Sequence, residues 1–515
     1  MKATPTNYNG VIIRRCWKFG FARKPLSKGR LDDMRLHFKL RHVPLVETIG
    51  RCVIAAGLGS AIAQAQQSSS LPSPGHIGNV ICAPDATQTY ALYLPSGYAT
   101  GKQWPIIYLF DPGGRGRRPV ELYKDVAEQY GFILAGSNNS RNFSSEQAKA
   151  VNAIWQDTHE RLSLDEHRSY ASGFSGGARV AGAMALSGPP GQIAGVIAHG
   201  AGYPGNRVGS KDDLPYFFAV GDEDFNWPEV INIRREREEN GSPYRVRVFH
   251  GKHQWAPAAE LGNALQYMNM KAMQSGHLTS EPAFIDRAWN ELKTEAAKAE
   301  ASNDPIAQLN ACRALVSDFS GLRDLKDANA KLAVVQQSPA LKTALKNERE
   351  QMSEQLKQEQ EITPRIESLA NNSVQDPNTL RLEIRQQMGG LYDQAKHSRN
   401  EAKRLISSRA FSGIVVRAIE EGQQELDGRH FEKAETYFDM MRQVSDDPWP
   451  VLLLADTQAA SGNRKLAIKN LQEAVRRGLK DPAVIESDAR LQTLKGDPDF
   501  ERLLAGLRQN NQSLQ

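Results

Sequence analysis

The sequence predicts an α/β protein in which a mostly parallel sheet, covered by helices, is followed by an all-helical region. Two observations predict this. Short apolar segments alternate with helical patterns up to about residue 275, and from about residue 281 Ala/Glu/Lys/Gln-rich stretches with few strand formers fill the chain. At 515 residues, with 40% hydrophobic and 24% charged residues, the chain has a globular composition and is long enough for two or three domains.

The expected sheet consists of seven apolar segments. They are residues 90–94, 105–110, 132–136, 169–173, 195–198, 217–220 and 244–249. Most of the intervening stretches are long enough to hold a helix, which is the spacing of strand–helix–strand units with parallel strands. We therefore place an α/β domain at residues 80–275, after a Ser/Pro-rich linker at residues 66–79.

An apolar run at residues 52–63 follows Arg51 and is closed by Ala63-Gln64-Ala65. A basic segment, a short apolar run and an A-x-A site are typical of a signal peptide, and the run is shorter than the roughly 20 residues of a membrane-spanning helix. We expect residues 1–65 to be removed, with Met34 as an alternative start and a possible non-native extension before it. The mature protein is expected in the periplasm or secreted, without stable membrane insertion; a buried core helix is the alternative.

The charge is unevenly distributed. Residues 1–65 carry a net charge of +9, and subtracting this from the overall +5 leaves −4 for the remainder. A mildly acidic mature chain gives no reason to expect nucleic acid as a partner.

Two cysteines remain after cleavage, Cys82 and Cys312, which allow one disulfide or two buried free thiols and do not have the spacing of a metal site.

The helical half is expected as a linker region at residues 276–420 and a repeat region at residues 421–510. Asp447-Pro448 recurs as Asp481-Pro482 after 34 residues, and Gly428 recurs as Gly462 at the same interval. This is the period of tetratricopeptide repeats, in which the proline ends the second helix of each pair. The sequence therefore predicts a tetratricopeptide-like region on which a protein partner could bind.

The most specific motif is G-x-S-x-G at residues 173–177 (GFSGG), between the expected strand 169–173 and a helix expected to begin near Ala178. A sharp strand-to-helix turn needs small flanking residues and exposes the central serine, which makes Ser175 the candidate nucleophile. The alternative is a purely structural glycine turn.

A serine hydroxyl needs an imidazole to take its proton. His253 follows the expected strand 244–249 and precedes a helix expected at residues 257–270, so it is the candidate base. His250 is the competitor, but at a strand end a structural histidine is more common.

The imidazole in turn needs a carboxylate that fixes its tautomer. Asp224 lies three residues beyond Gly221, which ends the strand 217–220, and is preferred over Asp222 and Glu223. The order Ser175, Asp224, His253 is the nucleophile, acid, base order of α/β hydrolases.

The oxyanion that develops on the substrate needs two backbone donors. Gly176 follows the nucleophile and is the first candidate. The second should come from the loop after the strand 105–110, where Pro112 has no N–H group, so Gly113 or Gly114 is expected. A plain glycine turn is the alternative.

Residues from Val80 to about Ser275 resemble bacterial exported esterases of the α/β-hydrolase superfamily, polyhydroxybutyrate-depolymerase-like and feruloyl-esterase-like proteins. The matching segments are residues 90–98 (YALYLPSGY), 165–177 (DEHRSYASGFSGG) and 251–255 (GKHQW). The resemblance covers about two-fifths of the chain and implies an α/β-hydrolase fold and Ser-His-Asp hydrolysis of a small-molecule or polymer-derived ester, with no cofactor and no metal. One departure is Asp111-Pro112, where the group commonly has His-Gly.

Asn138 and Arg141, which follow another expected strand, and Trp255 are possible substrate contacts, with packing as the alternative for the tryptophan. The short spacing from Ser175 to Asp224 and from Asp224 to His253 leaves little room for a lid.

Two other activities of the same triad remain open, those of a serine peptidase and of an acyl transferase. A partner-binding repeat protein with a secondary hydrolase domain is the alternative from a different class.

Overall fold

The computed structural model describes residues 70–188, 192–205 and 213–512. Its centre is an eight-stranded sheet in the order β1-β2-β4-β3-β5-β6-β7-β8. The strands are β1 (Ile77–Ile81), β2 (Thr89–Tyr93), β3 (Trp104–Phe110), β4 (Ile133–Ser137), β5 (Leu164–Phe174), β6 (Gly195–His199), β7 (Tyr216–Gly221) and β8 (Tyr244–Phe249). From β4 to β8 all neighbours are parallel, and β1 and β2 form an antiparallel extension at one edge. The predicted mostly parallel α/β sheet is confirmed.

Each of the seven expected segments is a strand, and most bounds agree within one residue; β5 begins five residues earlier than expected. The strand that the sequence did not predict is β1, which starts at Ile77, inside the segment expected as a linker. Its residues are IGNVI, with only Val80 fully buried, so it lacks the continuous apolar run that marks the central strands.

Helices cover both faces of the sheet. Those of this region are α2 (Arg117–Tyr130), α3 (Gln147–Arg161), α4 (Gly176–Ser187), α5 (Trp227–Asn240) and α6 (Ala258–Gln274). Along β3, Ile106, Tyr108 and Phe110 pack with α3, α4 and α5, whereas Ile107 and Leu109 pack with α2 and α6. Both faces are therefore buried, as expected for parallel strands. We call residues 77–274 the sheet region.

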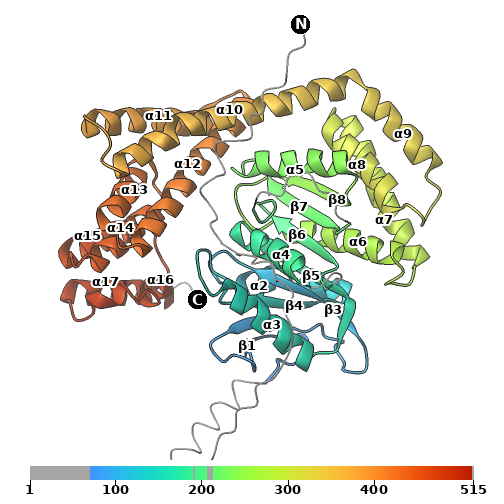
Figure 1. Ribbon diagram of the computed structural model, residues 1–515, viewed down its shortest axis with the longest axis horizontal. Coiled ribbons are helices and arrows are strands. Elements are labelled where there is room, and N and C mark those ends of the chain that lie inside the picture. Colours follow the sequence, from blue (N-terminus) through green and yellow to red (C-terminus); the bar gives the residue numbers. More distant parts are fainter. Residues whose placement is uncertain (1–69, 189–191, 206–212, 513–515) are drawn as a thin grey trace, which may run out of the picture.

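The remaining helices form what we call the helical arm, residues 282–512. They are α7 (Pro282–Ala301), α8 (Pro305–Asp318), α9 (Lys326–Gln337), α10 (Pro339–Ala370), α11 (Pro377–His397), α12 (Glu401–Asp427), α13 (Phe431–Val444), α14 (Pro448–Ala460), α15 (Arg464–Arg476), α16 (Pro482–Glu486), the 3-10 helix η1 (Leu491–Leu494) and α17 (Pro498–Gln512). In Figure 1, α7 to α9 lie beside the β8 side of the sheet, α10 extends across the top, and α11 to α17 descend on the left. The predicted all-helical second half is confirmed.

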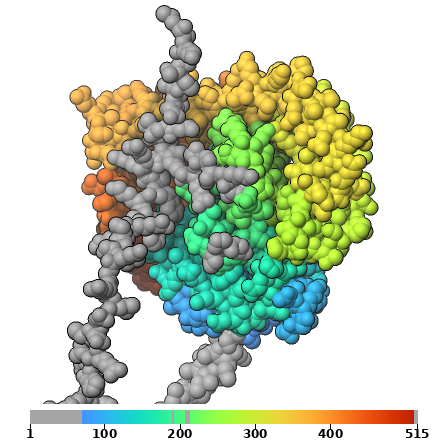
Figure 2. All heavy atoms as spheres, turned by 45° about the vertical axis from the view of Figure 1, so that its right-hand side comes forward, coloured from blue at the N-terminus to red at the C-terminus, as the bar shows by residue number. Residues whose placement is uncertain are grey.

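The arm packs directly against the sheet region. Phe284 and Phe319 of the arm share an apolar cluster with Met270 and Met273 of α6. Beside this cluster, Arg245 of β8 forms a buried ion pair with Asp318. Figure 2 shows the arm, in yellow to orange, adjoining the green sheet region along its upper and right sides.

The 34-residue repeat corresponds to helix pairs in the arm. Asp447 and Asp481 are N-caps whose carboxylates accept the backbone N–H groups of Trp449 and Ala483, so both Asp-Pro pairs begin helices, α14 and α16. The proline was expected to end a helix; instead it starts the next one, because the preceding helices already end at Val444 and Arg476. The assignment to tetratricopeptide repeats stays a prediction.

The expected signal peptide lies outside the described residues. Within the described part, none of the helices combines the length and the apolar character needed to span a membrane. Cys82 and Cys312 are both buried and both free, which decides between the two alternatives left open by the sequence.

Candidate active site

Three side chains meet at the edge of the sheet where the parallel strands end. Ser175 follows β5, Asp224 lies in the loop after β7, and His253 lies in the loop after β8. The Nε2 atom of His253 is 2.9 Å from the Oγ atom of Ser175, and its Nδ1 atom is 2.9 Å from both carboxylate oxygens of Asp224. The structure therefore brings together the three residues that the sequence selected.

Ser175 stands on a strained turn. Its backbone has φ 55° and ψ −122°, a conformation that non-glycine residues rarely adopt. The turn depends on small neighbours: a Cβ atom on Gly173 would lie 2.1 Å from the carbonyl O of Gly177, and one on Gly177 would lie 1.9 Å from the carbonyl O of Phe110. Both positions therefore exclude a side chain, and the serine projects from the turn.

His253 is enclosed by two aromatic rings. The ring centroid of Phe174 lies 4.5 Å from that of the imidazole, and the ring centroid of Phe225 lies 4.2 Å away. Its side chain keeps 17% exposure, whereas the Asp224 side chain is fully buried and also accepts the backbone N–H group of Asn226 at 2.8 Å. The rings and the carboxylate restrict the imidazole to one orientation, with Nε2 directed at Ser175.

The competitors weighed in the sequence form a second histidine–aspartate pair. His250 Nδ1 lies 2.9 Å from Asp222 Oδ2, but the histidine side chain is 82% exposed. Hydrogen bonding to Asp222 raises the pKa of His250. This pair contacts no serine in the described structure, so the preference for His253 and Asp224 agrees with the geometry.

The loop after β3 is organised by Asp111, which occupies the position where the resemblance led us to expect histidine. Its buried carboxylate accepts the N–H group of Gly113 at 2.8 Å and the indole N–H group of Trp255 at 2.9 Å, and its carbonyl oxygen accepts the N–H group of Gly114 at 2.9 Å. Both glycine donors expected for the oxyanion are thus directed at Asp111. These contacts do not support either glycine as the second donor; for Gly176 no such backbone contact competes.

Sequence reasoning missed Asn142. Its backbone N–H group donates to the carbonyl O of Pro112 at 2.8 Å, and its side chain lies directly over Gly176. A Cβ atom on Gly176 would stand 2.0 Å from the Asn142 Oδ1 atom and 2.5 Å from Nδ2, so the missing side chain at residue 176 makes the room that the amide fills. The nearest sequence signal was the Asn/Arg-rich stretch 138–142, from which we selected other members.

The expected substrate contacts are dispersed. Asn138 donates its amide to Asn79 and Thr89 at 2.7 and 3.0 Å, which connects β4 to the antiparallel extension. Arg141 is exposed on the loop that carries Asn142. Trp255 is 5% exposed and contacts Asp111, as noted above. Their role in substrate binding stays a prediction, and the contacts of Asn138 and Trp255 are of the structural kind.

A metal site was not expected. In the described ranges, no three His, Cys, Asp or Glu side chains come close enough together to hold a metal ion.

The chain matches no protein-family model and no curated protein sequence. Among solved structures it is similar to the S-formylglutathione hydrolase FrmB from Staphylococcus aureus, at 12% identity and a TM-score of 0.30, over 39% of this chain and 99% of that one. It is also similar to a ferulic acid esterase from Anaeromyces mucronatus (14%, TM-score 0.30, 38% and 89% covered) and to esterase B from Lactobacillus rhamnosis (13%, TM-score 0.33, 44% and 97% covered). Because the identities and TM-scores are this low, the chemistry of the site has to be argued from the residues of this chain.

Proposed function

We propose that this protein is a serine hydrolase that cleaves carboxylic esters through an acyl-enzyme intermediate. One observation carries the proposal: a continuous hydrogen-bonded chain runs from the Ser175 hydroxyl through the His253 imidazole to the buried Asp224 carboxylate. A serine on a strained turn, an oriented base and a buried acid are the parts that acyl transfer requires.

In the first half of the reaction, His253 Nε2 takes the proton of the Ser175 hydroxyl while Oγ bonds to the ester carbonyl carbon. The carbonyl electron pair moves onto its oxygen, and the Asp224 carboxylate stabilises the imidazolium. When the carbonyl re-forms, the bond to the alcohol oxygen breaks, and the alcohol leaves with the proton from His253. In the second half, His253 takes a proton from water while the water oxygen bonds to the acyl carbon. The bond from that carbon to Ser175 Oγ then breaks, Oγ regains the proton from His253, and the acid is released.

For the oxyanion we propose two donors, the backbone N–H group of Gly176 and the side-chain amide of Asn142. Gly176 follows the nucleophile, and the amide lies against its Cα atom. The backbone that carries this amide is fixed by the bond from the Asn142 N–H group to the Pro112 carbonyl. A donor fixed before the substrate arrives stabilises developing charge without having to reorganise.

Fluorophosphonate labelling of the purified mature protein tests the proposal. Wild type should be labelled and should hydrolyse short p-nitrophenyl esters, whereas Ser175→Ala should do neither, because the nucleophile is missing. His250→Ala is the matched control and should keep both properties. An unlabelled, inactive wild type would refute the proposal, and turnover of peptide amides instead of esters would replace the esterase with a peptidase.

We also propose that the protein is exported, from the apolar run and the Ala63-Gln64-Ala65 site. Expression of the full chain followed by fractionation should give a periplasmic or secreted product that begins at Gln66. An intact N-terminus in the cytoplasmic fraction would contradict export.

A further inference from the structure

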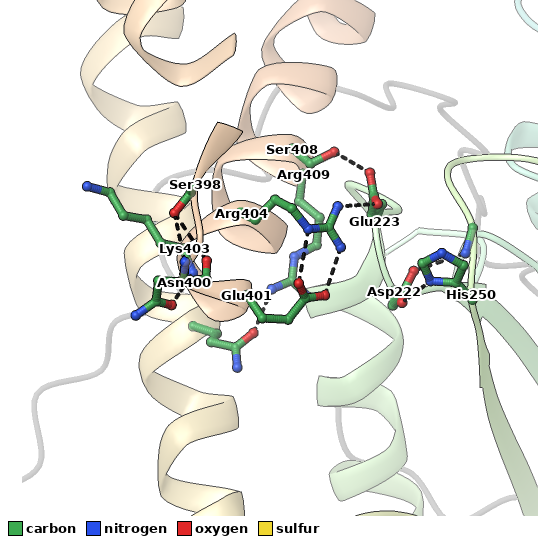
Figure 3. Close-up of polar contacts among 12 residues, drawn as sticks. Asp222, Glu223, His250, Ser398, Asn400, Glu401, Lys403, Arg404, Ser408 and Arg409 are labelled. Atoms are coloured by element: carbon green, nitrogen blue, oxygen red, sulfur yellow. Dashed lines mark hydrogen bonds and ion pairs between the residues drawn. The ribbon is translucent and has the colours of Figure 1, made fainter. Parts of the chain in front are cut away.

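The loop that carries Asp224 is held by the helical arm. Glu223, the residue before Asp224, accepts Arg404 Nη1 on Oε1 at 2.6 Å and the Ser408 hydroxyl on Oε2 at 2.8 Å, both from α12 (Figure 3). Glu401, one turn earlier, accepts Arg404 Nη2 at 2.7 Å and so orients the guanidinium. Both carboxylate oxygens of Glu223 are therefore bonded to the arm.

The residues after Asp224 are held in the same way. The ring of Phe225 lies against His253, and its carbonyl oxygen accepts a hydrogen bond from Gln355 Nε2 of α10 at 2.9 Å. Gly413 of α12 lies against the same residue, since a Cβ atom there would stand 3.2 Å from Phe225 Cβ. Further on, the guanidinium of Arg409 lies 4.0 Å from the ring centroid of Trp227. Two arm helices thus contact the chain on both sides of the acid.

These contacts are not ordinary surface ion pairs. The Glu223 side chain is 13% exposed and the Arg404 side chain 21%. Burial alone would raise the pKa of Glu223, but hydrogen bonds from Arg404 and Ser408 outweigh it and lower the pKa. Breaking the hydrogen bonds of a partly buried carboxylate leaves its charge without partners, which is costly. Such a pair therefore fixes the position of its loop more firmly than an exposed ion pair does.

The same helix carries a further carboxyl beyond these contacts. Glu420 lies two turns beyond Gly413 on one face of α12 and is half-buried. Burial raises the pKa of Glu420, while the nearby charges of Arg179, His253 and Arg417 oppose the rise.

We propose that the arm is part of the active site, with Glu223 as a positioning residue that Arg404 and Ser408 hold in place. Through the backbone on either side, this clamp of Glu223, Arg404 and Ser408 sets Asp224 and Phe225 against His253. The inference rests on the proposed function, because the clamp acts on the base of that reaction. Its loss should lower turnover and leave binding of a small ester unchanged.

Steady-state kinetics of full-length variants with p-nitrophenyl acetate test the clamp. Glu223→Ala and Arg404→Ala should each lower kcat about 10- to 100-fold with KM changed less than about twofold, because a misplaced catalytic group costs rate rather than affinity. The double variant should be no slower than either single one, since both remove the same contact. Glu223→Gln, which keeps acceptor and shape, should recover most of the rate.

The matched control is Arg365→Ala, which removes a pair with Glu383 inside the arm. If the control slows turnover as much as Arg404→Ala, or if folded Glu223→Ala keeps wild-type kcat, the clamp is refuted. Should Glu223→Ala fail to fold, Ser408→Ala removes one bond only and should still lower kcat; an unchanged kcat refutes the clamp there too. An active, labelled wild type with unaffected clamp variants overturns this inference alone, whereas an inactive wild type overturns the proposed function and this inference together.

Discussion

The sheet region and the helical arm use buried polar residues in different ways. In the sheet region, Ser175, Asp224 and His253 converge from three loops on one point, and Asp111 organises a fourth loop beside them. In the arm, buried polar groups connect neighbouring helices, or reach across to the sheet region as Arg404 does over 181 residues of sequence. The proposed function places the chemistry in the first region, and the proposed clamp makes the second region the support that aligns it.

The largest effect is expected within the sheet region, where the aspartate of each histidine–aspartate pair is removed in turn. Asp224→Asn should lower kcat on the order of 10⁴-fold, because the amide holds the imidazole in the wrong tautomer. Asp222→Asn, in the exposed pair with His250, should change kcat less than twofold. The measurement is ester turnover at pH 8 for both variants beside wild type. Equal losses would mean that the exposed pair shares in the chemistry.

A smaller effect is expected at the oxyanion. Asn142→Ala should lower kcat on the order of 10²-fold with little change in KM, because its amide is proposed to bond the oxyanion only in the transition state. Asn138→Ala is the control: its amide connects strands, so thermal stability should fall by a few degrees with kcat nearly unchanged. If Asn142→Ala stays within threefold of wild type, the second donor lies elsewhere.

The two regions should also differ in their response to acid. His199 is fully buried against Tyr123 and Trp255, and burial lowers its pKa to about 3. An unfolded histidine titrates near pH 6.5, so below that pH the unfolded chain takes up a proton that the folded one refuses, and stability falls. His199→Leu should reduce this loss by about 3 kcal/mol at pH 4. Thermal melts between pH 4 and 8 measure it, and parallel wild-type and variant curves would contradict it.

Asp456 in α14 should give the opposite sign. Burial and Asp488 raise the pKa of Asp456 to about 7, against the attraction of Arg490. An unfolded aspartate titrates near 3.9, so from about pH 4 to 7 the folded state keeps a proton that the unfolded state loses, and stability falls as pH rises. Asp456→Asn should remove this loss, which the two pKa values bound at about 4 kcal/mol by pH 8.

The control for Asp456 is Asp427→Asn, which removes the exposed partner of the same arginine. Its melting temperature should follow the wild-type pH dependence. If both variants shift alike, the effect belongs to Arg490 and not to the buried carboxyl.

Much of the sheet region could be predicted because parallel strands buried on both faces leave apolar runs in the sequence. The loop order then gave Ser175, Asp224 and His253. Two features of this region were not predicted. Strand β1 is an edge with few buried residues, so it leaves no run. The Asn142 side chain occupies the space that a side chain at Gly176 would need. Such a contact arises from tertiary packing and leaves no pattern in the sequence.

The contacts of the arm were also beyond sequence reasoning. Helical composition predicted helices, but Arg404 and Ser408 resemble any polar residues on an amphipathic helix. Their role appears only when α12 is packed against the loop after β7. Contacts between residues so far apart depend on tertiary packing, which local patterns do not encode.

Helix α10 makes the arm hard to detach. Its 32 residues extend about 48 Å without a break. Near the middle, Glu348 pairs with Arg234 of α5 and Gln355 bonds the Phe225 carbonyl, while Ile362 and Ile366 enter the core of the arm. Limited proteolysis should therefore give no cleavage between the two regions. A truncation after α6 would expose to solvent the face of α5 that α10 covers. The two regions should therefore have to be expressed as one chain to stay folded.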